Sequence, residues 1–246
     1  MKNILITGGA GFVGTHLSNY LSKKNNVTVI DNLSNGNKSG LIPKVKFIKG
    51  DIRDDLLISK LLKKNDYVLH LAAMVRLRES IENPLECFSI NVDGTINLVL
   101  NSLKNKVKKF IFASSCAVYP LNIKTKLKES MSSTGSTPYS ISKVVSENLI
   151  KFYLENTSVK YNCLRFFNIY GEGQSADSEY AAVIPSFLDK FRKIENLIIY
   201  GDGNQTRDFI NVHDVVRYYE IFLKSNKING TFFYIHFRNY GLSCPC

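Results

Sequence analysis

Short apolar runs alternate with longer segments of helical periodicity through the first two thirds of the chain. The apolar runs predict buried strands at residues 4–6, 27–30, 45–48, 67–71, 110–113 and 161–165. Between them, the spacing of apolar residues predicts packed helices at residues 12–23, 89–103 and 139–154. This alternation predicts an α/β fold in which a doubly wound parallel sheet carries helices on both faces.

The alternation changes after about residue 166. A polar, glycine-rich stretch at 171–177 leads into three predicted elements, which are a helix at 183–191, a strand at 197–200 and a helix at 212–224. We interpret residues 1–165 as a first domain. Residues 166–246 are then a smaller lobe, interleaved with the first domain and lying over the edge of its sheet.

A glycine-rich turn lies between the first predicted strand and the first predicted helix. Gly8, Gly11 and Gly14 allow a tight turn, close approach of a pyrophosphate and close packing of helix on sheet. The N-terminus of the helix offers free N–H groups to phosphates. Asp31 ends the second strand, where a carboxylate accepts hydrogen bonds from ribose hydroxyls and repels a 2′-phosphate. The pattern is typical of a Rossmann-type domain and favours NAD over NADP, although Asp31 could also be only a turn residue.

Two further positions carry candidate chemistry. Tyr139 and Lys143 are four residues apart and share one face of a predicted helix. A lysine near a phenol favours the phenolate, which could then exchange a proton with a substrate hydroxyl. Ser114 and Ser115 end the fifth strand, on the sheet edge where such folds bind ligands. Asp51, after the third strand, could hold an adenine amino group or begin the next helix.

Composition narrows the possible partners. The net charge is +11 and the pI about 9.3, but no basic stretch is interleaved with aromatic residues, so we expect no nucleic-acid partner. No run approaches the roughly 18 apolar residues of a membrane helix, and we expect no membrane partner. The five cysteines form no CxxC array, so we expect no metal site and no disulfide framework. These features favour the cytoplasm.

The motifs occur in an order that resembles the extended short-chain dehydrogenases/reductases, and among them the NAD-dependent epimerase/dehydratase family with its UDP-glucose 4-epimerase-like enzymes. The resemblance covers about residues 1–225. It rests on TGGAGFVG (7–14), DNLSNG (31–36), GDIRD (50–54), HLAA (70–73), NVDGT (91–95), SSCAVY (114–119), PYSISK (138–143), LRFFNIYG (164–171) and YGDGNQTRDFINVHD (200–214).

The resemblance implies a set of site residues. Ser115, Tyr139 and Lys143 would be catalytic, with Tyr139 as the acid/base and Lys143 on the nicotinamide ribose. NAD would be bound by Gly8, Gly11, Phe12, Val13, Gly14, Asp31, Asn32, Ser34, Asn35, Gly36, Asp51, Ile52, Leu71, Ala72, Ala73, Asn91, Ser114, Tyr139 and Lys143. A UDP-sugar would be bound by Ser115, Asn168, Val183, Ile198, Tyr200 and Arg207. A homodimer would form through helices near 89–104 and 139–154.

The implied reaction is epimerisation at C4 of the sugar through a transient 4-keto form. Dehydratases of the family usually carry an Asp-Glu pair where this chain has Cys116 and Ala117, which disfavours dehydration. GDP-sugar epimerase-reductases prefer NADP, which Asp31 opposes. UDP-glucuronate epimerases or decarboxylases stay open as alternatives, although the decarboxylases usually carry an acid near Cys116.

The last residues depart from the family. After Phe232 one expects a strand that ends in an Asn-Ile-Gly-type turn and then a further helical lobe, but residues 233–246 show no amphipathic period. We therefore expect a truncated or frameshifted C-terminus that lacks part of the substrate lobe. A non-catalytic NAD-binding remnant is the corresponding alternative to an active epimerase.

Overall fold

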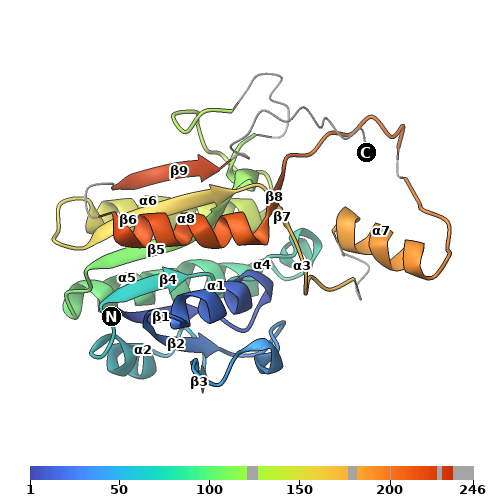
Figure 1. Ribbon diagram of the computed structural model, residues 1–246. Coiled ribbons are helices and arrows are strands. Elements are labelled where there is room, and N and C mark those ends of the chain that lie inside the picture. The colour runs from blue at the N-terminus through green and yellow to red at the C-terminus, as the bar shows by residue number, and fades with distance from the viewer. Residues whose placement is uncertain (121–126, 177–181, 200, 226–228, 235–246) are drawn as a thin grey trace.

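A computed structural model describes residues 1–120, 127–176, 182–199, 201–225 and 229–234 (Figure 1). Within these ranges, the main sheet has seven parallel strands in the order β3-β2-β1-β4-β5-β6-β9. Their bounds are β1 Asn3–Thr7, β2 Asn26–Asp31, β3 Lys46–Lys49, β4 Tyr67–His70, β5 Lys109–Ser115, β6 Lys160–Phe166 and β9 Gly230–Tyr234. The predicted doubly wound Rossmann-type sheet is confirmed.

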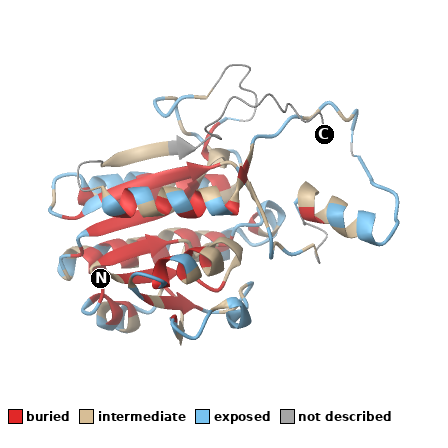
Figure 2. Ribbon diagram, viewed as in Figure 1, coloured by how far each residue is buried: buried red, intermediate tan, exposed pale blue. Residues whose placement is uncertain are grey.

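Helices cover both faces of the sheet. Successive buried side chains of a strand point to opposite faces, so both faces need a cover. On one face, Ile4 and Ile6 of β1 pack with α1 (Phe12–Ser22) and α8 (Val212–Lys224). On the other face, Leu5 packs with α2 (Asp55–Leu62), α5 (Gly94–Lys104) and α6 (Pro138–Leu154). The inner strands β2, β1, β4, β5 and β6 are largely buried and form the base for the loops at the carboxyl edge of the sheet (Figure 2).

Shorter elements connect these layers. They are the 3-10 turns Lys38–Gly40 and Cys116–Val118, α3 (Leu77–Glu82), α4 (Pro84–Phe88), the π-helical turn Ser89–Asp93, α7 (Val183–Arg192) and the paired strands β7 (Asn168–Tyr170) and β8 (Phe209–Asn211). The predicted helix at 89–103 is confirmed with a π-helical first turn, which continues from α4. None of the helices in the described ranges is long and apolar enough to span a membrane.

The strand predicted at 197–200 is wrong. Leu197, Ile198 and Ile199 are about half exposed and belong to no strand, and Tyr200 lies outside the described residues. Their apolar side chains satisfied the pattern, but a strand also needs a neighbouring backbone to pair with. In this part of the chain that pairing is made instead by Phe209–Asn211, only three residues long and preceded by polar residues.

The division into residues 1–165 and 166–246 stays a proposal. α8 packs against α1, and β9 pairs with β6 in the main sheet, so two elements of the second segment complete the first domain. α7 lies apart from the sheet (Figure 1). The strand after residue 229 forms, while residues 235–246, on which the expectation of a truncated C-terminus rests, lie outside the described residues.

Candidate active site

The glycine turn after β1 has the shape that a dinucleotide needs. Gly8 has φ +67°, and a Cβ there would be 2.6 Å from the main-chain nitrogen of Ala72. A Cβ at Gly14 would lie 2.1 Å from the carbonyl oxygen of Gly8. A Cβ at Gly11 would meet only that oxygen, at 3.3 Å, so the space over Gly11 is open. The glycines at 8 and 14 are required by packing, and the one at 11 leaves room for a ligand.

The first turn of α1 is free to bind an anion. Its N-cap is Gly11, no side chain caps its N–H groups, and no acidic residue lies in its first turn. Phe12 and Val13, half-buried, begin the helix there. Unpaired N–H groups and the positive end of the helix dipole favour a pyrophosphate at this point, so these residues fit the predicted NAD.

Asp31 is buried beside the same turn. Its carboxylate oxygens accept hydrogen bonds from the main-chain nitrogens of Ala10, at 3.0 Å, and Leu33, at 2.8 Å. Asp31 can therefore stabilise the turn and still accept hydrogen bonds from ribose hydroxyls, because each carboxylate oxygen has a second lone pair. Gly36 packs against Ala10, which brings the predicted loop residues back to the glycine turn. The other predicted residues of that loop, Asn32, Ser34 and Asn35, are exposed.

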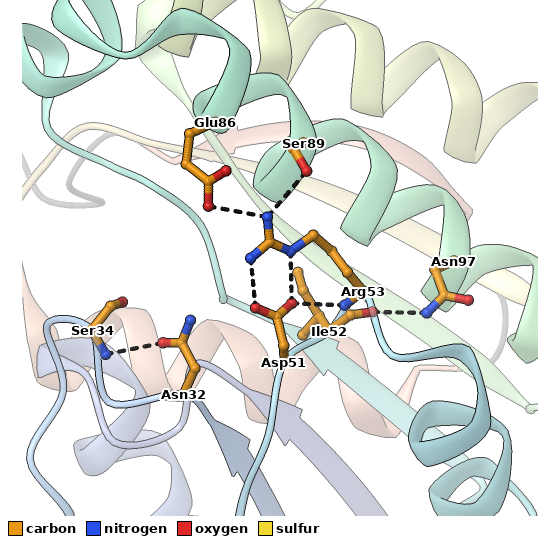
Figure 3. A network of polar contacts seen from close by, with 8 residues as sticks. All are labelled: Asn32, Ser34, Asp51, Ile52, Arg53, Glu86, Ser89 and Asn97. Carbon is orange, nitrogen blue, oxygen red and sulfur yellow. Dashed lines mark hydrogen bonds and ion pairs between the residues drawn. The ribbon is translucent and has the colours of Figure 1, made fainter.

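Asp51 does not begin the next helix. The N-cap of α2 is Asp54, whose side chain accepts from the Leu57 nitrogen. Asp51 instead forms an ion pair with Arg53 at 2.8 Å, and the hydrogen bonds from Arg53 hold the pKa of that carboxyl below its usual value. Arg53 reaches on to Glu86 at 3.0 Å, as Figure 3 shows, so it joins the loop after β3 to α4. Sequence reasoning missed Arg53.

Asp51 and the residue after it stay predictions as adenine contacts. The side chain of Asn32 also lowers the pKa of Asp51, so the loop after β2 lies beside the loop after β3. Ile52 is buried, and its carbonyl accepts from the side chain of Asn97 at 2.8 Å (Figure 3). Both residues are thus held in place from α5 and from the neighbouring loop.

The three predicted catalytic residues come together between β5 and α6. Thr137 and Ser140 cap α6 reciprocally, which fixes its first turn. The Tyr139 phenol lies close enough to the Ser115 hydroxyl for Ser115 to act on its pKa. The Lys143 ammonium donates to the Ala113 carbonyl at 2.9 Å and lies 5.9 Å from the centre of the Tyr139 ring.

The lysine does not by itself make the phenol acidic, contrary to the prediction. Burial raises the pKa of Tyr139 to about 12, and Ser115 opposes this only in part. Burial also lowers the pKa of Lys143 to about 8. Loss of hydration penalises both charged forms, and the Lys143 ammonium is directed at the Ala113 carbonyl rather than at the phenol oxygen.

A buried polar network supports the site from below. His70, at the end of β4, contacts the Thr7 hydroxyl at 2.7 Å and the Thr95 hydroxyl at 2.9 Å. Burial holds the pKa of His70 well below its usual value, so the ring is neutral. Asn91 accepts from Thr95 through its carbonyl and donates from its side chain to Ser142 of α6 at 2.9 Å. Asn91 therefore connects the strand ends to the catalytic helix, while its predicted contact with NAD stays a prediction.

The segment after β4 lies beside the glycine turn. Leu71, Ala72 and Ala73 are half-buried, and the nitrogen of Ala72 donates to the Thr7 hydroxyl at 3.2 Å. Since a Cβ at Gly8 would also contact Ala72, these predicted cofactor residues share one surface with the turn. Their contact with a cofactor stays a prediction.

A buried ion pair behind the catalytic residues was missed. Glu147 of α6 and Arg165 of β6 pair at 2.6 Å, with only 6% of each side chain exposed. The Ser114 hydroxyl donates to Glu147 at 2.5 Å, so this predicted cofactor residue is bonded inward. Arg165 also donates to the Tyr119 hydroxyl at 2.8 Å and to Ser133 at 2.8 Å. The available signal was two opposite charges within segments predicted to be buried.

The predicted substrate residues fall into two groups. Asn168 is exposed in β7 and donates to the carbonyl of Asp208 at 2.9 Å, which places it beside Arg207. Arg207 is exposed and lies near Cys116, the residue after Ser115. Its positive charge lowers the pKa of the Cys116 thiol and so opposes the effect of burial. Val183 begins α7 and Ile198 follows that helix, apart from the sheet (Figure 1). Tyr200 lies outside the described residues.

Known proteins share this architecture. The family model described as "NAD dependent epimerase/dehydratase family" matches residues 4–233. A putative UDP-glucose 4-epimerase of Methanocaldococcus jannaschii is 43% identical over 87% of this chain and 71% of its own length.

Two solved structures superpose closely. The UDP-N-acetylglucosamine 4-epimerase of Methanobrevibacter ruminantium, in complex with UDP-N-acetylmuramic acid, is 38% identical with a TM-score of 0.91, over 95% of this chain and 76% of its own. The UDP-glucose 4-epimerase of Thermotoga maritima, with UDP-glucose, is 33% identical with a TM-score of 0.91, over 96% of this chain and 77% of its own. The matched family model and these relatives show that the chain belongs to the NAD-dependent epimerase/dehydratase family.

Proposed function

We propose that this protein is an NAD-dependent nucleotide-sugar epimerase, with UDP-glucose/UDP-galactose or their N-acetyl forms as substrates. The observation that carries the proposal is the grouping of Ser115, Tyr139 and Lys143 at the carboxyl ends of parallel strands that also carry the open glycine turn. The named epimerases among its relatives support the same activity.

The residues suit a reversible proton transfer at the sugar C4 hydroxyl. Ser115 positions that hydroxyl, and Tyr139 accepts its proton and later returns it. When bound, NAD would supply the hydride acceptor and donor for C4 and would add a positive charge near the phenol. Lys143 is held by its hydrogen bond to the Ala113 carbonyl, and we place its ammonium on the nicotinamide ribose. A neutral resting Tyr139, with its pKa at about 12, needs the charges of the complex before it ionises.

NAD rather than NADP follows from Asp31. Its buried carboxylate is held by two main-chain N–H groups, so it cannot swing away from a 2′-phosphate. Asp51 and the segment Leu71–Ala73 complete the proposed dinucleotide surface.

Epimerisation is favoured over dehydration at the same sheet edge. Cys116 and Ala117 begin the 3-10 turn after Ser115, where a carboxylic acid would be needed to remove water. Burial raises the pKa of the Cys116 thiol, which is therefore a protonated thiol and no acid/base at neutral pH. On the substrate diphosphate we place Asn168 and Arg207, since amide and guanidinium donors suit phosphate oxygens. Val183, Ile198 and Tyr200 are proposed around the nucleotide.

A homodimer and a cytoplasmic location belong to the same proposal. α5 and α6 pack side by side and leave Leu100, Ile141 and Phe152 exposed, with Phe152 79% exposed. A pair of such helices from each of two chains would cover these residues. The described cysteines Cys87, Cys116 and Cys163 are free thiols, which suits a reducing compartment.

The decisive experiment is an epimer assay. The full chain is incubated with NAD and, in parallel, with UDP-, dTDP- and GDP-linked sugars, and the products are separated by chromatography. We expect UDP-galactose from UDP-glucose, or the corresponding N-acetyl pair. Tyr139→Phe should reduce turnover roughly 100- to 10,000-fold without loss of NAD binding.

The matched control is Tyr153→Phe, on the same helix and outside the site. It should leave turnover unchanged. NAD binding without any epimer formation by the native chain would overturn the proposal and identify a non-catalytic remnant. Release of a 4-keto-6-deoxy sugar or of carbon dioxide would instead identify a dehydratase or a decarboxylase of the same family.

A further inference from the structure

Three potential metal ligands meet on the face of the sheet covered by α1 and α8. His16 lies in α1, Glu172 follows β7, and His213 is in the first turn of α8. One ligand atom from each lies within 4.8 Å of the other two. The three residues are far apart in sequence, so no motif indicated the site, and the sequence predicted no metal.

The cluster is already held together without a metal. The ring nitrogen Nε2 of His16 contacts the main-chain oxygen of Glu172 at 2.8 Å, and Nε2 of His213 lies 3.3 Å from the Glu172 carboxylate. The two imidazole rings meet edge to face with their centres 5.4 Å apart. Phe12 packs against the other side of the His16 ring at 5.7 Å. Both rings therefore face Glu172, His16 at its main-chain oxygen and His213 at its carboxylate.

We propose that His16, Glu172 and His213 form a zinc site that joins α1 to α8. Two imidazoles and a carboxylate are ligands that Zn²⁺ prefers, with water in a fourth, tetrahedral position. Tetrahedral bonds of about 2.0–2.2 Å put ligand atoms roughly 3.4 Å apart, so small side-chain rotations complete the site. The exposed side chains of Glu172 and His213 are free to make them, while His16 exchanges its hydrogen bond for coordination.

The surroundings allow a metal with an open position. A hollow of about 310 Å³ adjoins the cluster and is lined by both histidines, with Lys23 and Arg217 at its sides. Arg217 is paired with Asp214 at 3.3 Å, which offsets its charge near the site. Since α1 begins at the dinucleotide turn, zinc at His16 would tie that turn to the start of α8.

Metal titration of the full, tag-free chain tests the proposal. After removal of metals with a chelator, Co²⁺ is added as a spectroscopic probe and Zn²⁺ then competes with it. We expect one equivalent of tetrahedral Co²⁺ without thiolate bands, and Zn²⁺ binding at roughly micromolar concentration. At a hundredfold excess over Kd, the midpoint of thermal unfolding should rise by roughly 5–10 °C.

Variants decide which residues bind. His16→Gln and His213→Gln should each weaken Zn²⁺ binding roughly tenfold or more, and Glu172→Gln should do so to a smaller extent. Glu195→Gln removes an exposed carboxylate elsewhere and should change nothing. The double variant Cys244→Ser/Cys246→Ser should bind as tightly as the native chain, because the proposed ligands include no thiol.

The proposal is overturned by unchanged affinity in both histidine variants, by loss of binding in the cysteine variant, or by absence of saturable binding below about 100 µM Zn²⁺. The last result would identify an ordinary surface ion pair between Glu172 and His213. Because binding and unfolding are read directly, the outcome does not depend on whether the chain is an active epimerase.

Discussion

The parallel sheet and the segment around α7 use their apolar residues in opposite ways. In the sheet, Ile4, Leu5 and Ile6 have no exposed surface, and the loops at its carboxyl edge rest on that base. Around α7, Phe191 is 76% exposed and Ile194 is 95% exposed. Packing therefore fixes the geometry of the dinucleotide turn and of Tyr139, whereas α7 buries Pro185 alone among its residues and leaves Leu188 and Phe191 exposed.

The difference indicates how the two halves of the proposed site are stabilised. The catalytic and cofactor residues are positioned by burial, by the capped start of α6 and by hydrogen bonds that connect neighbouring strands. Val183 and Ile198 lie on a segment with an exposed apolar surface, and such surfaces mark sites of contact with a partner or a ligand. Four predictions, from the largest expected effect to the smallest, test the contrast.

Removal of the buried Glu147 carboxylate, which accepts a hydrogen bond from Ser114, should have the largest effect. Glu147→Ala leaves the Arg165 charge unpaired in the interior and should lower the free energy of unfolding by about 3–5 kcal/mol. Urea unfolding measures it. The double variant Glu147→Ala/Arg165→Met should recover part of the loss, and Glu82→Ala, in an exposed pair, should cost under about 0.5 kcal/mol. Equal effects of the variants at 147 and 82 would contradict the buried pair.

Substitution of two glycines in the dinucleotide turn should affect different properties, one the free energy of unfolding and the other NAD binding. Gly14→Ala forces a Cβ toward the Gly8 carbonyl and should cost about 1–3 kcal/mol of unfolding free energy. Gly11→Ala meets only a 3.3 Å contact and should change stability little, while it weakens NAD binding. Thermal unfolding and NAD titration of both variants measure the difference. Unimpaired NAD binding by Gly11→Ala would place the pyrophosphate elsewhere.

The buried charge of Lys143 should lower the free energy of unfolding at neutral pH. Burial lowers the pKa of Lys143 from 10.5 to about 8, so below pH 8 the folded state carries a poorly hydrated charge. That net shift corresponds to at most about 3 kcal/mol. Lys143→Met should therefore raise the free energy of unfolding by roughly 1–2 kcal/mol while turnover falls.

The stability gained by Lys143→Met should depend on pH in a defined direction. Between about pH 8 and 10.5 the unfolded chain binds more protons at Lys143 than the folded chain does, so native stability gains with rising pH. The advantage of Lys143→Met should be largest below pH 8 and disappear toward pH 10.5. An advantage that grows above pH 8 would contradict a lowered pKa. Chemical unfolding at several pH values measures it.

Substitution on the exposed side of α7 should have the smallest effect. Phe191→Ser removes an apolar side chain that is already largely in water, so unfolding free energy should change by under about 0.5 kcal/mol. Phe110→Ser, in the fully buried strand β5, is the matched control and should be strongly destabilising. A large loss of unfolding free energy in Phe191→Ser would show that the Phe191 side chain packs against another part of the chain.

Much of the fold could be predicted from short patterns, and less of the site. The apolar runs at 4–6, 67–71 and 161–165 lie in strands because those strands are buried on both faces and need continuous apolar residues. The same pattern failed at 197–200, where no neighbouring strand is available to pair. The strand at 168–170 was missed because three residues carry too little periodicity.

The sequence by itself determined the order of the strands β1 to β6, the glycine turn with its helix, and the pairing of Tyr139 with Lys143 on one helical face. These follow from local spacing, which a linear chain displays directly. Only the tertiary structure decided the Glu147–Arg165 pair, the Arg53 bridge and the meeting of His16 with Glu172 and His213. It also decided the protonation of Tyr139, because the cost of removing a phenolate from water depends on everything packed around it.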